Sequence, residues 1–233
     1  MNNFNYYCNV NGSDKGDIAP DGNHYAGWYE NWFAPLKEKV TNICEIGVYN
    51  GGSTKAFYDY FPNTQIIGLD IFDKTQYEND RTITKIVDQG SYEQLDNFIS
   101  ECNNQNLQFD IILDDGSHDV IHQQITFGKL FQLVKPGGIY IIEDMCTSYF
   151  TLGTTLYGYS QTQAKIDNNT IKFLNTRPFS SIWINPSDIE YINNNVEYVS
   201  IFDRLNTTCT YLDQFNCENN YPPRSITSII KKR

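Results

Sequence analysis

Two groups of acidic residues stand at the ends of two apolar runs in this sequence. The stretch DDGSH, residues 114–118, follows the apolar run 109–113, and Glu143 with Asp144 closes a second run about one supersecondary unit later. Carboxylates and an imidazole gathered at the ends of buried strands are costly unless a cation or a proton transfer uses them. The pattern therefore predicts a site with cation binding or acid–base chemistry.

The elements that position these groups are predicted by the hydrophobic pattern. From about residue 43 the chain alternates short apolar runs with segments of helical period, which is typical of β-α-β units. Strands are expected at 43–48, 65–69, 84–87, 109–113 and 138–142, and helices at 53–61, 91–103 and 122–133. A C-terminal antiparallel hairpin is expected from strands at 196–203 and 225–230. Since right-handed crossovers place helices on both faces, the expected fold class is α/β, a doubly wound, mostly parallel seven-stranded sheet.

One compact domain is expected for a chain of 233 residues. We expect an N-terminal helical cap over 1–42 and a core that carries the site over 43–145. A long loop or lid over 146–195 and C-terminal strands over 196–233 would follow. Within the cap, the segment 23–40 is helix-like and rich in aromatic residues. Such a stripe is usually core packing, with a lid that contacts a ligand as the alternative.

The acidic composition limits the possible partners. The formal net charge is −11 and the pI is about 4.6, which argues against nucleic acid or an anionic membrane because either needs a basic surface. The N-terminus lacks the features of a signal peptide, and no apolar run is long enough to span a membrane. The six cysteines have no C-x-x-C spacing, so free thiols and a cytoplasmic location are expected. The aromatic N-terminal segment is a candidate homo-oligomer interface.

A glycine-rich turn follows the first expected strand. Glu45 and Gly47 are followed by Asn50, Gly51 and Ser53. Glycines here let the backbone approach a ligand, while the next helix offers free N–H groups. The spacing is acid-x-Gly-x-x-x-Gly-Gly, not the Gly-x-Gly-x-x-Gly of dinucleotide sites. A carboxylate before the turn suits a cationic or hydroxyl-bearing ligand better than a phosphate.

The next two strands also end in polar residues. Asp70 stands about 23 residues after Gly47, in place to accept hydrogen bonds from ribose hydroxyls. Asp88, Gln89 and Gly90 follow the third strand, where an amide and backbone groups could read an adenine edge. An Asp after a strand is by itself more often a helix cap or turn residue. Three polar strand ends in succession nevertheless predict a nucleoside-shaped crevice.

These motifs together resemble a known family. The turn from Glu45, with Asp70 and Asp88-Gln89, looks like the S-adenosyl-L-methionine site of class I methyltransferases, which implies a Rossmann-like sheet. Over roughly residues 12–150 the chain resembles the narrower group of macrocin- and mycinamicin-type sugar O-methyltransferases. The motifs that carry this likeness are Ser13-Asp14-Lys15, His24-Tyr25, Tyr29-Glu30, Asp115-Gly116-Ser117-His118, His122-Gln123, Thr126-Phe127, Leu130-Phe131, Pro136-Gly137-Gly138 and Ile142-Glu143-Asp144. The resemblance implies O-methylation of a sugar or glycosylated small molecule, with Ser13 and Tyr25 beside the cofactor.

The resemblance also implies a metal, Mg²⁺ or Mn²⁺, held by Asp115, Glu143 and Asp144. The chemistry agrees with this, because carboxylates suit such hard cations and a cation lowers the pKa of an acceptor hydroxyl. His118 would then be the general base. Asp114, which strand alternation turns away from Asp115, is expected to face the methionine portion of the cofactor.

Other interpretations of the same residues stay open. Asp114 with Asp115 could cap a helix, and His118 could be a solvated loop histidine. His118 and His122 have the i, i+4 spacing of some zinc sites, but no third His or Cys ligand is evident. The alternative functions are a catechol-like O-methyltransferase, a metal-dependent hydroxylase or other oxidoreductase on the same fold, and a binding module without turnover.

Overall fold

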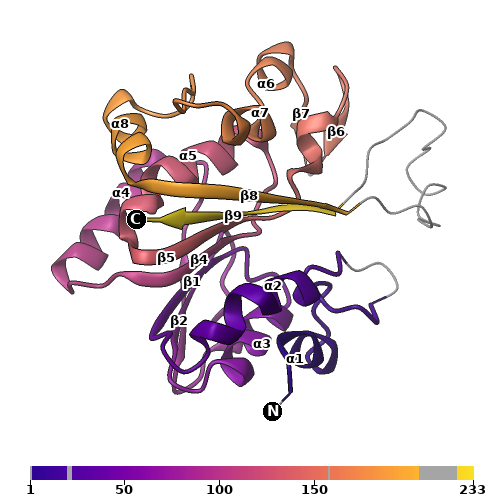
Figure 1. The fold of residues 1–233 in the computed structure, drawn as a ribbon, viewed down its shortest axis with the longest axis vertical. Coiled ribbons are helices and arrows are strands. Elements are labelled where there is room, and N and C mark those ends of the chain that lie inside the picture. Colours follow the sequence, from indigo (N-terminus) through magenta and orange to yellow (C-terminus); the bar gives the residue numbers. More distant parts are fainter. Residues whose placement is uncertain (1, 20–22, 157, 205–224) are drawn as a thin grey trace.

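The structure is a computed structural model and describes residues 2–19, 23–156, 158–204 and 225–233. Seven strands form one sheet in the order β3-β2-β1-β4-β5-β9-β8 (Figure 1). Strands β1 to β5 are parallel, whereas β9 runs antiparallel to both β5 and β8. Their bounds are β1 Asn42–Ile46, β2 Gln65–Asp70, β3 Thr82–Ile86, β4 Phe109–Asp114, β5 Val134–Ile142, β8 Val196–Arg204 and β9 Ser225–Lys232. The expected α/β sheet and its C-terminal antiparallel hairpin are confirmed.

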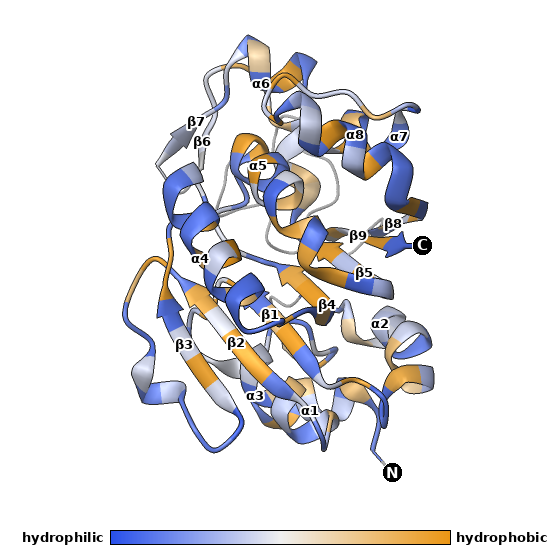
Figure 2. Cartoon of the chain, turned by 90° about the vertical axis from the view of Figure 1, so that its left-hand side faces the viewer, coloured by the Kyte–Doolittle hydropathy of each residue, from blue (hydrophilic) through white to orange (hydrophobic). Residues whose placement is uncertain are grey.

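Helices cover both faces of this sheet (Figure 1 and Figure 2). One face carries α1 (Phe4–Val10), α2 (Ala26–Phe33) and α3 (Gly52–Tyr60), and the other carries α4 (Tyr92–Asn104), α5 (Val120–Leu130) and α8 (Pro186–Asn195). Each face has its own buried apolar cluster. Phe33 and Phe57 belong to the first cluster, and Phe98 and Phe127 belong to the second. The expected doubly wound arrangement and the N-terminal helical segment are therefore present.

The local sequence explains the central elements. The part of β4 over 111–113 and the part of β5 over 139–142 are continuous, buried apolar runs, because helices cover both faces of these strands. In α4 the buried residues Leu95, Phe98, Ile99 and Cys102 recur at helical spacing. The Ser91 side chain caps this helix by accepting a hydrogen bond from the Gln94 N–H at 3.3 Å.

The carboxyl ends of β1, β4 and β5 meet at one edge of the sheet. Asp114 pairs with Ile46 of β1 on one side and with Ile142 of β5 on the other. Just beyond the strands, Asp115 N donates to Ile46 O and Glu143 N donates to Asp114 O, both at 2.9 Å. This register brings the two acidic groups together beside the turn that follows β1.

The segment 146–195, expected as a long loop or lid, contains regular elements. They are the 3-10 helix η4 (Met145–Tyr149), a hairpin of β6 (Thr155–Leu156) and β7 (Tyr159–Ser160), and the helices α6 (Gln163–Asp167), α7 (Thr170–Asn175) and α8. Helices α6 and α7 have only five and six residues and show no clear apolar period, so the hydrophobic pattern does not predict them. Their caps are nevertheless readable, since the side chains of Thr162 and Asn169 accept N–H hydrogen bonds at the starts of α6 and α7.

Helix boundaries elsewhere differ from the expected ones by a few residues. The helix expected over 23–40 ends at Phe33 and continues as the 3-10 helix η1 (Ala34–Leu36), which contains a proline. Helix α5 begins at Val120 rather than at 122, because the Asp119 side chain caps it, and it ends in η3 (Phe131–Leu133). A further 3-10 helix, η2 (Thr75–Tyr77), precedes β3.

Cys8, Cys44 and Cys102 are buried free thiols, as expected, and the Cys146 thiol lies 3.6 Å from the backbone oxygen of Asp144. Cys209 and Cys217 lie outside the described residues. No helix in the described part of the chain combines the length and apolar character that crossing a membrane requires.

Candidate active site

The turn that follows β1 requires glycine at two positions. Gly47 has a φ of +88° and Gly51 a φ of +74°, values that favour a residue without a side chain. A Cβ atom at Gly47 would also collide with the backbone carbonyl of Asp115. The backbone of the turn is therefore held close to the end of β4, and α3 starts directly after it.

Glu45 and Asn50 stabilise this turn. The Glu45 carboxylate accepts hydrogen bonds from the hydroxyls of Ser53 and Thr54 in the first turn of α3. Asn50 Oδ1 accepts a hydrogen bond from the first backbone N–H of α3 at 3.2 Å. Burial raises the pKa of Glu45 to about 7, although neighbouring positive charge and the two hydroxyls oppose this. Glu45, expected to contact a ligand, is fully buried in the structure and links β1 to α3.

Asp70, at the end of β2, is bonded to the same turn. Its Oδ2 accepts hydrogen bonds from the backbone N–H groups of Val48 and Tyr49, both at 3.0 Å, and its Oδ1 accepts one from Phe72 at 2.9 Å. A carboxylate oxygen can accept a second hydrogen bond. The contacts are therefore compatible with the role toward a ribose hydroxyl that the sequence predicts.

Gln89, in the loop after β3, joins the ends of β3 and β4. Its Nε2 donates to Asp114 Oδ1 at 3.0 Å, and its Oε1 accepts a hydrogen bond from Ser117 N at 2.6 Å. In the same loop, Asp88 Oδ1 accepts a hydrogen bond from Gly90 N at 2.8 Å. The amide expected to read an adenine edge is thus used within the protein, where it orients Asp114.

Asp114 is a buried carboxylate with only one of its oxygens bonded. Its Oδ1 accepts hydrogen bonds from Gln89 and, at 3.4 Å, from Gly116 N. Within the described ranges no group donates to the buried Oδ2. Burial raises the pKa of this carboxyl to about 7. Because buried polar atoms normally have partners, Oδ2 is a candidate contact for a ligand.

Asp115 turns the other way, toward His118 and Asp144. One ligand atom from each of these three residues lies within 4.8 Å of the others. His118 Nδ1 is 4.0 Å from Asp115 Oδ1, and His118 Nε2 is 3.8 Å from Asp144 Oδ2. The side chains are 12%, 16% and 19% exposed for His118, Asp115 and Asp144, so they are sheltered but reachable.

Two of these three residues hold a backbone conformation that most residues avoid. His118 has a φ of +58° and Asp144 a φ of +50°. His and Asp tolerate this left-handed region better than most residues, but it still costs free energy. The conformation turns both side chains toward the same point, which is how residues at a functional site are often held.

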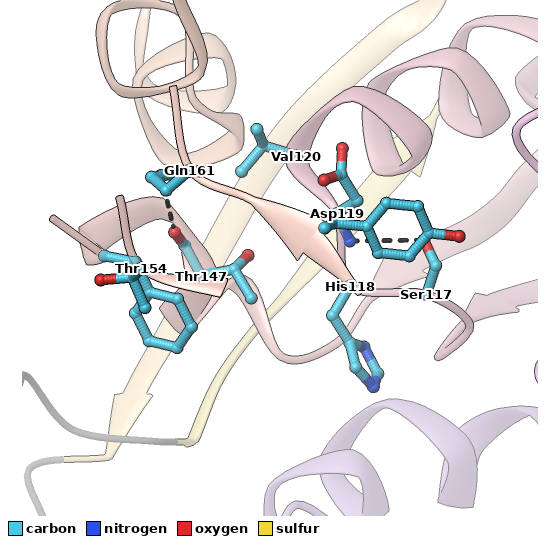
Figure 3. A pocket seen from close by; sticks show the side chains of 9 residues that line it. Ser117, His118, Asp119, Val120, Thr147, Thr154 and Gln161 are labelled. Atoms are coloured by element: carbon cyan, nitrogen blue, oxygen red, sulfur yellow. Dashed lines mark hydrogen bonds between the residues drawn. The ribbon is translucent and has the colours of Figure 1, made fainter. Parts of the chain in front are cut away.

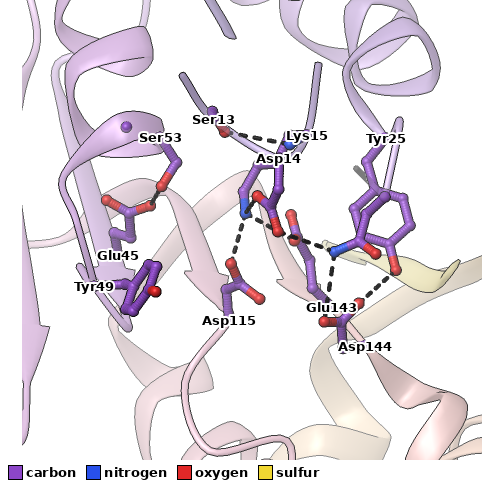
Figure 4. Close-up of polar contacts among 12 residues, drawn as sticks. Ser13, Asp14, Lys15, Tyr25, Glu45, Tyr49, Ser53, Asp115, Glu143 and Asp144 are labelled. Atoms are coloured by element: carbon purple, nitrogen blue, oxygen red, sulfur yellow. Dashed lines mark hydrogen bonds and ion pairs between the residues drawn. The ribbon is translucent and has the colours of Figure 1, made fainter. Parts of the chain in front are cut away.

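Glu143 is held by protein groups behind this trio. It is 0% exposed, its Oε1 accepts a hydrogen bond from Tyr29 OH at 2.7 Å, and its Oε2 lies 2.9 Å from Lys15 Nζ. The same ammonium is 2.6 Å from Asp115 Oδ2 (Figure 4). Burial alone would lower the pKa of Lys15, but Asp115 and Glu143 together outweigh burial and raise it well above its usual value. Lys15 therefore lies as a cation between two of the three expected metal ligands.

The N-terminal cap supplies further contacts to the acidic cluster. Tyr25 OH donates to Asp144 Oδ1 at 2.8 Å, and Asn23 Nδ2 reaches Asp144 Oδ2 at 3.5 Å. Ser13 Oγ accepts a hydrogen bond from Lys15 N at 3.3 Å. Ser13 and Tyr25, expected beside the cofactor, are thus found against Lys15 and Asp144.

Lys15 and Tyr29 stand in the motifs that carry the family resemblance, but the sequence predicts no role for either in the site. Tyr29 lies in an aromatic stripe of the kind that usually packs a core, and its ring does pack there. The available signal for Lys15 is electrostatic, because buried carboxylates need a nearby positive charge. This argument predicts that a positive charge lies near the carboxylates, but it does not predict that Lys15 supplies it.

A hollow of about 260 Å³, its open part included, lies beside His118 (Figure 3). It is bounded by the start of α5, by η4 and by the β6–β7 hairpin. Thr147 and Gln161 give it polar walls, and Phe150 and Tyr159 give it two aromatic rings. An ion pair between Lys165 of α6 and Asp119, both buried, connects this segment to α5.

The geometry fits neither helix capping by Asp114 or Asp115 nor a zinc pair of His118 and His122. Asp119, not Asp114 or Asp115, caps α5. His122 Nδ1 lies 2.9 Å from Ser117 Oγ, its ring packs on Tyr159, and burial lowers its pKa. Since His118 precedes the helix and faces the carboxylates, the two histidines do not share a helix face as a zinc pair would.

The donor set fits a hard divalent cation. Asp115 and Asp144 offer carboxylate oxygens beside His118, and Glu143 Oε2 is a buried oxygen with an ion pair but no hydrogen bond among the described residues. Oxygen-rich sets of this kind suit Mg²⁺ or Mn²⁺.

Comparison with known proteins gives several relatives. No family model matches the chain. It is 38% identical over 129 residues to mycinamicin VI 2''-O-methyltransferase of Micromonospora griseorubida, covering 52% of this chain and 31% of that protein. It is 34% identical over 146 residues to 8-demethyl-8-alpha-L-rhamnosyl tetracenomycin-C 2'-O-methyltransferase of Streptomyces olivaceus, covering 60% and 36%. Demethylmacrocin O-methyltransferase of Streptomyces fradiae is 34% identical over 129 residues, covering 52% and 32%. The expected resemblance to sugar O-methyltransferases is confirmed, and the chain spans about a third of the length of these relatives.

Solved structures share the fold. MycE methyltransferase from the mycinamycin biosynthetic pathway, in complex with Mg, SAH and mycinamycin VI, matches with a TM-score of 0.71 at 24% identity, over 100% of this chain and 55% of that one. An O-methyltransferase from Bacillus cereus in complex with SAH matches with a TM-score of 0.52 at 16% identity, over 98% and 90%. The fold is therefore the Rossmann-like fold of class I methyltransferases, as expected.

Proposed function

We propose that this chain catalyses a methyl transfer from S-adenosylmethionine, dependent on a divalent cation, to a hydroxyl of a sugar or glycosylated small molecule. The observation that carries this proposal is the meeting of Asp115, His118 and Asp144 beside a hollow at the carboxyl ends of β4 and β5. Similarity to curated sugar O-methyltransferases supports the reaction class.

The cofactor would lie over the turn after β1. Gly47 and Gly51 bring the backbone close there, and Asp70 remains able to accept a hydrogen bond from a ribose hydroxyl. Asp114 Oδ2 is a buried acceptor for the ammonium of the methionine portion. Gln89 would act indirectly, by orienting Asp114.

Asp115 and Asp144 would hold the cation, with Glu143 directly behind them on Lys15. When bound, a Mg²⁺ or Mn²⁺ ion would lower the pKa of the acceptor hydroxyl and orient it. These carboxylates turn toward His118 because the register of β4 and β5 and the left-handed backbone at Asp144 direct them there.

His118 is proposed as the base that accepts the hydroxyl proton at Nε2. Its Nδ1 is buried against Asp115, which leaves Nε2 as the nitrogen that faces Asp144 and the site. A carboxylate near each ring nitrogen attracts the positive charge that the ring gains on protonation. No other histidine among the described residues lies in this cluster.

The hollow beside His118 would receive the acceptor. The enclosed part of the hollow has room for about one water molecule, so most of an acceptor ring would lie in its open part, against the walls. Thr147 and Gln161 offer hydrogen bonds, and Phe150 and Tyr159 offer apolar ring faces. The net charge of −11 favours an acceptor without negative charge.

The test is a methyl-transfer assay on a panel of glycosides, free sugars and catechols. The expected product is a glycoside that gains one methyl group by mass spectrometry, with turnover abolished by chelator and restored by Mg²⁺ or Mn²⁺. Methylation of catechols alone would support the catechol-like alternative, and iron-dependent oxygen consumption would support a hydroxylase. Binding of S-adenosylmethionine without any methylated product from such a panel would contradict the proposal.

The variant Asp115→Asn tests whether Asp115 binds the metal. Its control is Asp96→Asn, which removes an exposed carboxylate on α4. We expect Asp115→Asn to lose turnover while it still binds S-adenosylhomocysteine, because the Asp115 side chain faces His118, Asp144 and Lys15. Undiminished turnover of this variant in chelator would remove the metal from the proposal.

A further inference from the structure

Lys15 is a buried cation inside an acidic cluster. Its side chain is 1% exposed, and its Nζ lies 2.6 Å from Asp115 Oδ2, 2.9 Å from Glu143 Oε2 and 3.7 Å from Asp14 Oδ1. Figure 4 shows the ammonium between the carboxylates contributed by β4 and β5. A fully buried carboxylate and a partly buried one so close together are costly without a positive charge between them.

We propose that Lys15 is the built-in counter-cation of this site: it holds Asp115 and Glu143 together in the metal-free protein and opposes the binding of a divalent cation there. The inference rests on the metal dependence of the proposed function. A divalent cation and an ammonium would draw on the same carboxylate charge, and two cations only a few ångströms apart repel each other. Lys15 would therefore set how tightly the metal is held.

The backbone fixes Lys15 in this position. Lys15 O accepts a hydrogen bond from Ala26 N at 2.9 Å, and Lys15 N donates to Ser13 Oγ at 3.3 Å. Ser13 N in turn donates to Cys8 O, at the end of α1, at 2.9 Å. Because residue 15 is tied both to α1 and to the start of α2, its side chain is directed into the cluster.

The remaining contacts of the two carboxylates show what its removal would leave. Among the described residues, the Glu143 carboxylate would keep only the hydrogen bond from Tyr29 OH. Asp115 would keep its Oδ1 near His118, 4.0 Å away. Substitution of Lys15 by an uncharged residue therefore leaves buried negative charge without a cation, which a divalent ion can then neutralise.

The experiment compares Lys15→Met with the wild-type full chain. Mn²⁺ affinity is measured by isothermal titration calorimetry, and the melting temperature is measured with chelator and with saturating Mn²⁺. We expect Lys15→Met to bind Mn²⁺ at least about tenfold more tightly than the wild type. We also expect it to melt at a lower temperature in chelator and to gain more from Mn²⁺ than the wild type gains.

Two controls separate this role from ordinary buried-lysine packing. Lys165→Met removes another buried lysine paired to a carboxylate, Asp119, which is outside the metal cluster. It should lose stability by a similar mechanism, but Mn²⁺ should not restore it. Lys15→Arg retains the positive charge, so its Mn²⁺ affinity should not tighten.

The outcomes distinguish this inference from the proposed function. If neither the wild type nor Lys15→Met binds Mn²⁺, both the metal dependence of the proposed function and the inference about Lys15 are overturned. Mn²⁺ binding to the wild type with equal or weaker binding to Lys15→Met would overturn only the role of Lys15. If Lys15→Met is unfolded in chelator, folding upon Mn²⁺ addition supports the role, and failure to fold at any Mn²⁺ concentration contradicts it.

Discussion

His118 and Asp144 share a left-handed backbone and face each other across the site at 3.8 Å. A residue keeps such a conformation only when its surroundings fix it. Here the surroundings are the ends of β4 and β5, which pair without a shift from Ile111 and Ile139 to Asp114 and Ile142. The chemistry proposed for His118 therefore depends on a side chain whose direction is set by its backbone.

The base role of His118 predicts the effect of His118→Asn. Asparagine tolerates a positive φ, so the fold and the binding of S-adenosylhomocysteine should be retained while kcat falls about 10²- to 10⁴-fold. His24→Asn is a matched control, because His24 also has a left-handed backbone, with a φ of +57°, and its Nε2 lies 3.2 Å from the backbone oxygen of Ala19. Steady-state kinetics and calorimetry check both variants, and a near-normal kcat for His118→Asn would assign the base elsewhere.

Glu45 predicts a pH dependence of stability. Burial raises its pKa from 4.5 to about 7, so between these values the folded protein keeps a proton that the unfolded chain releases. Stability from this group is thus highest below pH 4.5 and falls as the pH rises to 7, by about 3 kcal/mol. Glu45→Gln should abolish this part of the fall, as urea unfolding across that pH range would show. The exposed Glu38→Gln should leave the slope unchanged, and parallel slopes for Glu45→Gln and wild type would contradict the shift.

At the scale of elements, the site depends on how closely the turn after β1 approaches the end of β4. Gly47 N donates to Leu69 O at 2.8 Å and Asp115 N donates to Ile46 O at 2.9 Å. The turn is therefore bonded between β2 and β4. Hydroxyls at the start of α3 complete it through Glu45.

Two glycines with similar backbone angles separate the effect of this close approach from that of backbone strain. Gly137→Ala, where φ is +76° and a Cβ would meet nothing within 4 Å, should lose about 1 kcal/mol of stability from strain alone. Gly47→Ala should lose about 2–4 kcal/mol, because its Cβ also displaces the carbonyl of Asp115. It should also weaken S-adenosylhomocysteine binding. Equal losses for the two variants in chemical unfolding would show that the approach of β4 does not matter.

At the scale of the whole molecule, one sheet separates two apolar clusters. Trp28 and Trp32 pack against the cluster under α1 to α3, and Trp183 packs against the one under α4 and α5. The strands that carry the site contribute side chains to both clusters, such as Ile111 to the first and Ile112 to the second. A ligand at the carboxyl ends of these strands should therefore stabilise both faces together.

Tryptophan fluorescence can test this coupling. In Trp183→Phe, the fluorescence comes from Trp28 and Trp32, on the face covered by α1 to α3. In the double variant Trp28→Phe/Trp32→Phe, it comes from Trp183, on the face covered by α4 and α5. For each variant, we expect the unfolding midpoint from fluorescence to equal the midpoint from circular dichroism. We also expect S-adenosylhomocysteine, at 100 times its Kd, to raise the free energy of unfolding by about 2.7 kcal/mol in both variants. A ligand shift confined to one face would contradict a single cooperative unit.

The sequence by itself determined the strands, their order of appearance and the polar residues at their ends. Apolar runs such as 109–113 are long enough to specify buried strands, and the carboxyl ends of parallel strands meet at one edge. For that reason the sequence predicts that Asp115, His118 and Asp144 lie near one another, as they do in the structure. The short helices between 146 and 195 are not, because a helix of five or six residues shows too few turns for a period.

Only the tertiary structure decided which protein groups neutralise the acidic side chains or form hydrogen bonds with the polar side chains at the strand ends. Gln89 and Glu45 carry the residue types of ligand contacts, yet their polar atoms are bonded within the protein. Lys15 lies 100 residues before Asp115 in the chain and meets it at 2.6 Å. Electrostatic pairing acts through space and depends on burial, so a linear pattern predicts the need for a cation in the acidic cluster but not that Lys15 supplies one.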